Sequence, residues 1–196
     1  MKPAPLKLFL TGDPGCGKTT AIRRVVERLR GRLPMRGFVT EEITGEQGRA
    51  GFQGRTLDGR TFLLADRQES SDLRVGPYHV VLDGLEQIGV PALRPAADTG
   101  LVILDEVGKM ESFSPAFREC VEDLLAGDTP VLATVASHGV GFVKRVRRDS
   151  RIELLRMRRR ARDAVVGDIV RRLTAANVIP QAARPASSAA GRNDRP

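Results

Sequence analysis

The sequence is poor in the residue types that build metal knuckles, disulfide frameworks and aromatic stacking surfaces. Its 196 residues include no tryptophan, one tyrosine, two histidines and two cysteines. Cys16 and Cys120 are too few and too far apart in sequence for a metal knuckle, so we interpret both as small apolar residues. No apolar run approaches the roughly 18 residues that a membrane-spanning helix requires. We therefore expect a cytoplasmic protein with no membrane partner.

Basic residues are concentrated in the C-terminal third of the chain. The formal net charge is +8, and residues 144–172 hold twelve Lys or Arg against four Asp or Glu, which accounts for the whole excess. Such a segment could contact the phosphates of a nucleic acid, but it has no Trp or Tyr on which bases could stack. We expect a solvated arginine-rich face, with RNA or DNA binding as the alternative. No feature of the sequence specifies an oligomeric state.

The pattern of apolar residues predicts strands that alternate with helices. Compact apolar runs at 6–10, 101–104 and 131–135 are typical of buried parallel strands. Helical spacing is found in four further segments, 22–33, 80–93, 114–125 and 152–173. Ser114 is the expected N-cap of the third helix, and Gly127 its stop signal. We expect the second helix to be closed by Gly89 and Pro91, and the last segment to be a long arginine-rich helix or a helix pair.

These elements predict a three-layer α/β fold around a mainly parallel central sheet. Short β-rich runs between about residues 37 and 66 surround the pair Asp58-Gly59, which is a strong hairpin signal, so we expect a small antiparallel β insertion there. Residues 1–178 are expected to form one domain. Residues 179–196 have almost no large apolar side chains and are expected to form a disordered tail.

A phosphate-binding pattern, G-x-x-x-x-G-K-[ST], stands between the first strand and the first helix. It comprises Gly12, Asp13, Pro14, Gly15, Cys16, Gly17, Lys18 and Thr19. The glycines allow successive N–H groups to point at phosphate oxygens near the positive end of the helix dipole. Lys18 would bring a cation to the β and γ phosphates, and the Thr19 hydroxyl would ligate Mg²⁺. The pattern predicts a nucleoside triphosphate and Mg²⁺ as ligands.

Two carboxylates follow the second apolar strand at its C-terminal end, where ligands of open α/β sheets bind. Asp105 suits a Mg²⁺ partner that acts through the water shell of the metal. Glu106 is expected on the opposite side of the strand axis, where it could orient the attacking water as a general base. With the phosphate-binding pattern, this pair favours hydrolysis of the terminal phosphate.

The chain resembles the THEP-type nucleoside-triphosphatase family, relatives of the cancer-related nucleoside triphosphatase. The matching stretches are 12–20, 36–42, 75–78, 105–111 and 131–134, within a span of roughly 7–172. The resemblance implies an ASCE-type (RecA/AAA-like) P-loop core and slow hydrolysis of several nucleoside triphosphates. It also implies that Thr20, Val107 and Gly108 lie at the nucleotide.

Two departures from the family pattern concern Cys16 and Ala161. The family usually has Val or Ile at position 16, a change that leaves the backbone cradle intact. It usually has Asn-Arg-Asp where this chain has Ala161-Arg162-Asp163, which removes the Asn amide and puts in doubt any hydrogen bond made there. Arg162 remains, either as an arginine finger that reaches the γ-phosphate or as one more arginine on a solvated helix face.

Further residues of the matching stretches have open roles. Thr134 ends the third core strand, where it either senses the γ-phosphate and positions water or reflects β propensity alone. Lys109 and Glu111 are expected to shape the loop after the second core strand, with direct substrate contact as the alternative.

The leading hypothesis is a Mg²⁺-dependent nucleoside-triphosphate phosphohydrolase with broad base specificity, acting on ATP, GTP and other nucleoside triphosphates. No Asn-Lys-x-Asp segment supports guanine specificity. A small-molecule or nucleotide kinase that uses the same P-loop is the first alternative. An RNA-associated regulatory NTPase is the second.

Overall fold

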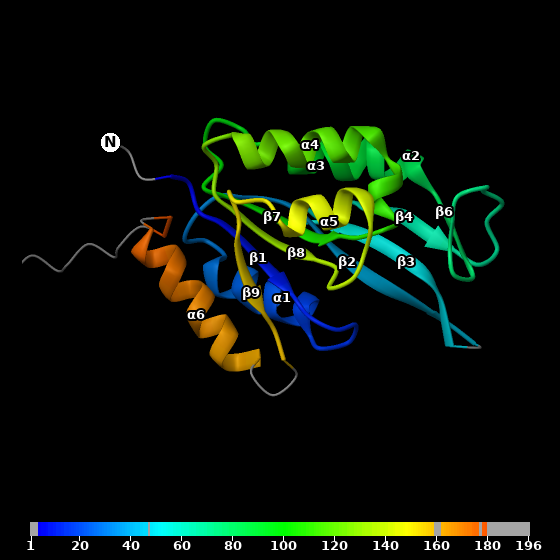
Figure 1. The fold of residues 1–196 in the computed structure, drawn as a ribbon, viewed down its shortest axis with the longest axis horizontal. Helices are drawn as coiled ribbons and strands as arrows, with labels where there is room; N and C mark the ends of the chain where they lie inside the picture. Colours follow the sequence, from blue (N-terminus) through cyan, green and yellow to red (C-terminus); the bar gives the residue numbers. More distant parts are fainter. Residues whose placement is uncertain (1–3, 47, 159–161, 177, 180–196) are drawn as a thin grey trace, which may run out of the picture.

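A single mixed sheet organises the chain (Figure 1). The computed structural model describes residues 4–46, 48–158, 162–176 and 178–179. Within these residues, nine strands pair in the order β5-β6-β4-β3-β2-β7-β8-β1-β9. No helix within the described ranges is long and apolar enough to cross a membrane.

Five of the strands form the parallel part of the sheet. They are β1 (Lys7–Thr11), β2 (Met35–Gly45), β7 (Leu101–Val107), β8 (Val131–Val135) and β9 (Glu153–Arg156). β7 pairs in parallel with β2 and β8, and β1 pairs in parallel with β8 and β9. The three predicted core strands are confirmed as β1, β7 and β8. All five carboxyl ends therefore meet at one edge of the sheet.

The remaining strands extend the sheet beyond β2. They are β3 (Gly48–Thr56), β4 (Thr61–Asp66), β5 (Arg74–Val75) and β6 (Tyr78–Val80). β3 pairs antiparallel with β2 and with β4, and the turn between β3 and β4 contains Asp58 and Gly59. The antiparallel strands continue to Val80, beyond residue 66, at which the sequence-based segment ends.

Helices cover both faces of the sheet (Figure 1). One face carries α2 (Leu82–Gly84), η1 (Leu85–Gly89), α3 (Val90–Leu93), α4 (Pro115–Ala126) and α5 (Gly141–Arg147). The other face carries α1 (Lys18–Leu29) and α6 (Arg162–Ala175). Alternate side chains of β1 supply the two cores, since Phe9 packs in the α4 core whereas Leu8 and Leu10 pack in the α1 core. This period of two is the expected signature of a strand buried on both faces.

The predicted limits of α4 are confirmed. The Ser114 hydroxyl accepts a hydrogen bond from the Phe117 N–H at 3.0 Å, and Pro115 occupies the first turn. The helix ends at Ala126, directly before Gly127. A side-chain cap and a proline without an N–H thus satisfy the start of the helix.

The predicted closure of the second helix at Gly89 and Pro91 is wrong. The helical path continues through both residues to Leu93. A Cβ atom on Gly89 would lie 2.8 Å from Cζ of Phe62, so the glycine allows the helix to pack closely against β4. Pro91 lies in the first turn of α3, where its missing N–H is tolerated.

The predicted arginine-rich helix or helix pair over 152–173 is also wrong in its first part. Residues Glu153–Arg156 form the edge strand β9, and the helix α6 begins only at Arg162. Leu155 and Met157 face the core while Leu154 and Arg156 are exposed, which is the alternation of a strand. Pairing with the free edge of β1 outweighs the helix propensity of this segment.

The predicted tail, 179–196, lies outside the described residues apart from Ile179. That residue is buried in the core beside α1 and α6. The domain therefore extends at least one residue beyond the predicted boundary at 178.

Candidate active site

The phosphate-binding loop joins β1 to α1 at the carboxyl edge of the sheet. Gly15 and Gly17 have φ angles of 71° and 99°, a left-handed conformation that residues with side chains rarely adopt. Gly17 is also the N-cap of α1, and no side chain caps the helix. The N–H groups of the first turn, which begins with Lys18, Thr19 and Thr20, thus keep their capacity to bind an anion.

The rest of the loop is fixed by short local contacts. The Cys16 N–H donates to the Asp13 carbonyl at 3.1 Å. A Cβ atom on Gly12 would lie 2.6 Å from the Met157 carbonyl and 2.9 Å from the Cys16 sulfur. The segment after β9, which includes Met157, therefore forms one wall of the loop.

Cys16 and Cys120 are both buried and unbonded to other cysteines, in agreement with their interpretation as apolar residues.

Lys18 connects the loop to the carboxylates of β7. Its side chain is 9% exposed, and its Nζ donates to the Gly12 carbonyl at 3.1 Å. The same nitrogen lies 3.5 Å from Oε2 of Glu106. A single ammonium group thus lies between the glycine loop and the end of β7, where the β and γ phosphates of a nucleotide would need a positive charge.

Asp105 is completely buried at the end of β7. The Thr134 hydroxyl of β8 donates to its Oδ1 at 2.6 Å, whereas its Oδ2 has no hydrogen-bond partner among the described residues. Burial raises the pKa of Asp105, and the Thr134 and Thr19 hydroxyls and the charge of Lys18 act in the opposite direction. A buried carboxylate oxygen without a partner, close to Thr19, fits a role toward Mg²⁺ or its bound water.

Glu106 is the carboxylate that contacts Lys18, since its Oε2 lies 3.5 Å from Nζ, and the charge of Lys18 lowers the pKa of both Glu106 and Asp105. The expected placement of Asp105 and Glu106 on opposite sides of the strand axis stays a prediction. The pairing register between β7 and β8 shifts between Leu104 and Val107, so the regular alternation of side chains does not hold across these residues. Burial raises the pKa of Glu106, while Lys18 lowers it and Asp105 raises it further.

Val107 and Gly108 follow the two carboxylates but contribute differently. The Val107 side chain is buried, and its carbonyl accepts a hydrogen bond from the Ala136 N–H at 3.2 Å, so this residue extends the sheet. Gly108 begins the turn to η2 (Glu111–Phe113) and lies directly beside Glu106 and Glu111. Glu111, which was expected to shape this loop or to contact the substrate, is 4% exposed.

Two further site residues were missed or assigned loosely. The Thr40 hydroxyl of β2 donates to the backbone carbonyl of Asp105. Thr40 belongs to the matching stretch 36–42, which was the available signal. Thr134 donates directly to Asp105, so its hydroxyl takes part in the site, and its role toward the γ-phosphate or water stays a prediction.

The predicted arginine finger is not placed by the structure. Arg162 is the first residue of α6, but its side chain and the whole of Ala161 lie outside what the structure describes. The next residue, Asp163, forms an ion pair with Arg24 of α1. The start of α6 is thereby tied to the helix that follows the P-loop, and the role of Arg162 stays a prediction.

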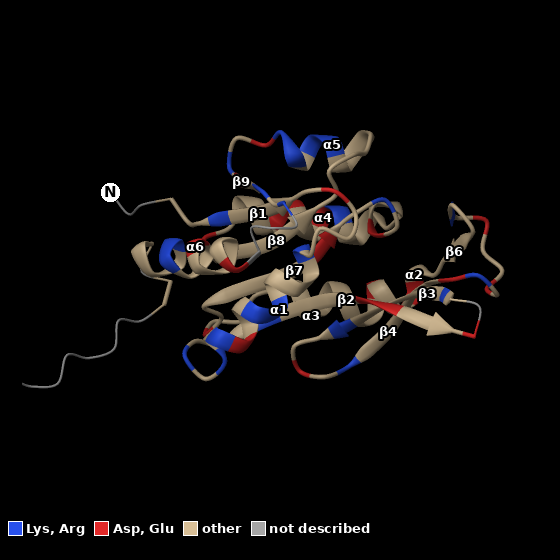
Figure 2. Cartoon of the chain, turned by 90° about the horizontal axis from the view of Figure 1, so that it is seen from below, with Lys and Arg blue, Asp and Glu red and all other residues tan. Residues whose placement is uncertain are grey.

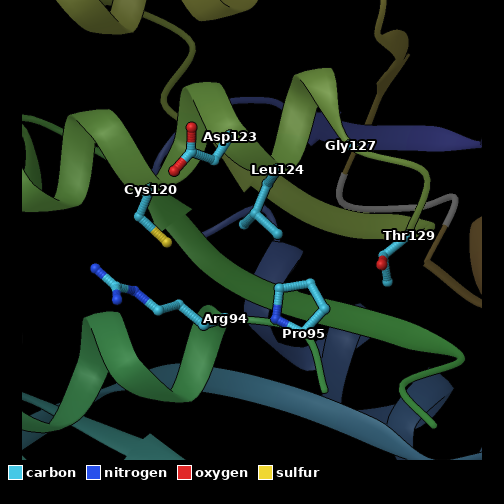
Figure 3. A pocket seen from close by; sticks show the side chains of 7 residues that line it. All are labelled: Arg94, Pro95, Cys120, Asp123, Leu124, Gly127 and Thr129. Carbon is cyan, nitrogen blue, oxygen red and sulfur yellow. The ribbon is translucent and has the colours of Figure 1, made fainter. Parts of the chain in front are cut away.

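A cavity of about 300 Å³ lies at the opposite edge of the sheet (Figure 3). It is lined by Arg94, Pro95, Cys120, Asp123, Leu124, Gly127 and Thr129. Pro95 precedes β7 and Thr129 precedes β8, so the cavity is near the amino ends of parallel strands whose carboxyl ends carry Asp105 and Thr134. It does not belong to the phosphate-binding site.

The comparisons with known proteins identify relatives of the whole chain. A family profile described as NTPase matches residues 7–170. The nucleoside-triphosphatase THEP1 of Methanosarcina barkeri is 40% identical over 171 residues, with 85% of this chain and 97% of the relative covered. The cancer-related nucleoside-triphosphatase homolog of Mus musculus is 36% identical over 181 residues, with 83% and 94% covered.

A comparison with solved structures leads to the same family. The crystal structure of THEP1 from the hyperthermophile Aquifex aeolicus is similar with a TM-score of 0.78 at 34% identity, and the match covers 86% of this chain and 99% of that one. The resemblance inferred from the sequence motifs is confirmed by the family profile, by the curated relatives and by this structure. The chain therefore belongs to the NTPase family that includes the THEP1 nucleoside-triphosphatases.

Proposed function

We propose that this protein hydrolyses nucleoside triphosphates to the diphosphate and phosphate in a Mg²⁺-dependent reaction. The observation that carries the proposal is the convergence of Lys18, Asp105 and Glu106 at the mouth of the glycine loop. The proposal is also supported by the printed names of the relatives, nucleoside-triphosphatase THEP1 and cancer-related nucleoside-triphosphatase homolog.

Each residue at the loop has a distinct task in this reaction. The N–H groups at the start of α1 and the Lys18 ammonium would bind the phosphates and offset the charge that develops on the transferred group. Glu106 would accept a proton from a water molecule while the oxygen of that water bonds to the γ-phosphorus. The bond between the γ-phosphorus and the β-phosphate oxygen breaks in the same step. The Lys18 contact keeps Oε2 of Glu106 near the phosphate site.

Thr19 and Asp105 are the residues that would hold Mg²⁺. When bound, the ion would act as a Lewis acid that offsets negative charge on the phosphates. The described residues contain no cluster of three or more His, Cys, Asp or Glu that could hold a metal. This supports a cation that arrives with the nucleotide, because Mg²⁺ commonly uses one or two carboxylates together with substrate phosphates.

The core is proposed to be of the ASCE (RecA/AAA-like) type. The order β2-β7-β8-β1-β9, in which β8 separates the P-loop strand from the strand with Asp105, supports this assignment. Broad base specificity is supported by the lack of an Asn-Lys-x-Asp segment in the sequence and by relatives whose names specify no base.

The test is phosphate release from ATP, GTP, CTP and UTP by the purified protein, with and without Mg²⁺. Lys18→Ala and Glu106→Gln should each lower kcat by about 100-fold or more. Lys144→Ala and Glu27→Gln are matched controls, because both residues are exposed on helices away from the loop, and they should keep wild-type rates. Hydrolysis that survives both active-site substitutions would overturn the proposal.

The two alternatives make different predictions in the same assay. A kinase would consume the triphosphate together with a nucleoside or nucleoside monophosphate, without equivalent release of phosphate. An RNA-associated enzyme would be stimulated by RNA at low salt. Against the second alternative, four arginines of the basic segment already form ion pairs with acidic side chains: Arg145, Arg151, Arg171 and Arg172. The basic segments are spread over α5, β9 and α6, with acidic segments near them (Figure 2).

A further inference from the structure

Glu111 is a buried carboxyl group beside the proposed catalytic base. It opens the short helix η2, its side chain is 4% exposed, and it forms no ion pair within the described part of the chain. The Ser112 N–H donates to the Gly108 carbonyl at 3.2 Å, and the Ser114 N–H donates to the Glu111 carbonyl at 3.1 Å. The turn that presents this carboxyl group is therefore fixed at both of its ends.

The Glu106 and Glu111 carboxyl groups face each other across Gly108. A Cβ atom on Gly108 would lie 2.8 Å from Oε2 of Glu111 and 3.2 Å from Oε1 of Glu106, so these two oxygens are within about 6 Å of each other. Two oxygens at such a separation can be joined through one bridging water. The other oxygen of Glu106, Oε2, is the one near Lys18. Glu106 is thus placed between an ammonium group and a second carboxyl group.

The charges at this position make it unfavourable for both glutamates to be ionised. Glu106 has the Lys18 ammonium as a partner, whereas burial and the charge of Glu106 raise the pKa of Glu111 to about 8. Asp105 adds a further negative charge that acts on Glu111. Glu111 is then mostly neutral at pH 7 and carries an O–H that can donate toward the Glu106 carboxylate.

We propose that Glu111 is a positioning residue for hydrolysis, which holds Oε1 of Glu106 from behind so that Oε2 faces Lys18 and the attacking water. This inference rests on the proposed role of Glu106 as the base. Glu111 is not proposed to contact the nucleotide or the attacking water itself. It acts on them through Glu106. Gly108 is part of the device, because any side chain there would fill the space between the two carboxyl groups.

The experiment compares kcat and KM for ATP hydrolysis at saturating Mg²⁺ in the wild type, Glu111→Ala, Glu111→Gln and the control Glu119→Ala. Glu119 is an exposed glutamate on α4. Glu111→Ala should lower kcat by about 10-fold or more with little change in KM, because a misplaced base slows chemistry without loss of nucleotide contacts. Glu111→Gln retains the shape and a donor, so its kcat at pH 7 should stay within about 3-fold of the wild type.

Two further readouts separate positioning from a general loss of structure. Above pH 8 the wild-type kcat should fall as Glu111 ionises beside Glu106, whereas Glu111→Gln should keep its rate. In the background of Glu106→Gln, the change Glu111→Ala should cause no further loss, because the two residues act as one unit. If Glu111→Ala does not fold, the comparison of the pH profiles of Glu111→Gln and the wild type still tests the positioning role.

The outcomes distinguish this inference from the proposed function. An unchanged kcat in folded Glu111→Ala, or identical pH profiles for Glu111→Gln and the wild type, would overturn the positioning role while Glu106→Gln remained inactive. Full activity of Glu106→Gln would instead show that the proposed function of Glu106 is wrong.

Discussion

Replacing Glu111 with Gln measures how strongly the folded protein prefers a neutral carboxyl group at this position. The pKa of Glu111 is raised from 4.5 to about 8 by burial and by the charge of Glu106. Gln has the same shape as a protonated Glu but cannot ionise. The two proteins should therefore have similar free energies of unfolding well below pH 4.5, where Glu111 is protonated in both the folded and the unfolded state.

The size and sign of the effect follow from proton linkage. Between pH 4.5 and about 8 the unfolded chain has released the proton of Glu111 while the folded protein retains it. The stability of the wild type must then fall relative to Glu111→Gln by about 1.4 kcal/mol for each pH unit. Across the full window the difference reaches about 5 kcal/mol and stays constant at higher pH.

The difference between the two proteins removes the contributions of other titrating groups. Asp105 also has a raised pKa, and Lys7 has a pKa lowered from 10.5 to about 8, but both residues are present in each protein. The assay is urea denaturation followed by circular dichroism at pH 5, 6, 7 and 8 at constant ionic strength. Glu119→Gln on α4 is the control. Parallel stability curves for the wild type and Glu111→Gln would refute the assignment of a proton to Glu111.

Two further predictions concern packing and a buried lysine. Gly54→Ala should destabilise the protein by about 2 kcal/mol or more in the same denaturation assay, because the new Cβ would lie 2.1 Å from Cζ of the buried Phe62 ring. The control Gly167→Ala, in α6 with no atom within 4 Å of the new Cβ, should stabilise it by about 0.5–1 kcal/mol; equal effects at both positions would contradict this account. Lys7 donates to the carbonyls of Leu124, Gly127 and Thr129 at 2.5, 2.8 and 2.6 Å. Burial lowers its pKa to about 8, so wild-type stability should gain a rising contribution between pH 8 and 10.5, and Lys7→Met should lack it.

The elements that the sequence predicted well are those whose limits are set by neighbouring residues. The core strands are short apolar runs next to turn residues, and α4 begins at a side-chain cap and ends at a glycine. Gly89 shows the opposite case, because its meaning depends on Phe62, which is far away in sequence. From the local sequence pattern, such a glycine is predicted to end a helix. Only the packing of η1 on β4 shows that the glycine permits close contact.

β9 failed for a related reason. Its exposed residues are Glu153, Leu154 and Arg156, of which two are charged. The run 153–156 therefore does not resemble the compact apolar strands at the centre of the sheet. An edge strand needs only one apolar face and one hydrogen-bonded neighbour, which β1 provides. The sequence pattern therefore cannot specify this strand without the position of β1.

The chemistry of the site was more predictable than its geometry. Lys18, Asp105 and Glu106 were identified from motifs, since the residue types and their strand-end positions are local features. The contact between Lys18 and Glu106 was not predictable, because it depends on how the end of β7 lies relative to the loop. The burial of Glu111 was not predictable either, since it depends on how the turn from Gly108 packs.

The position of Thr134 follows from the strand order. β8 lies between β1 and β7, so the P-loop strand and the strand of Asp105 are separated by two strand spacings, or roughly 10 Å. The Lys18 side chain, which starts at the first turn of α1, reaches Glu106 at the end of β7. The last residues of β8 then lie between these two strands, where Thr134 pairs in register with Leu10 and donates to Asp105. With one oxygen of Asp105 held by this hydroxyl, the other oxygen is left for the Mg²⁺ that we propose.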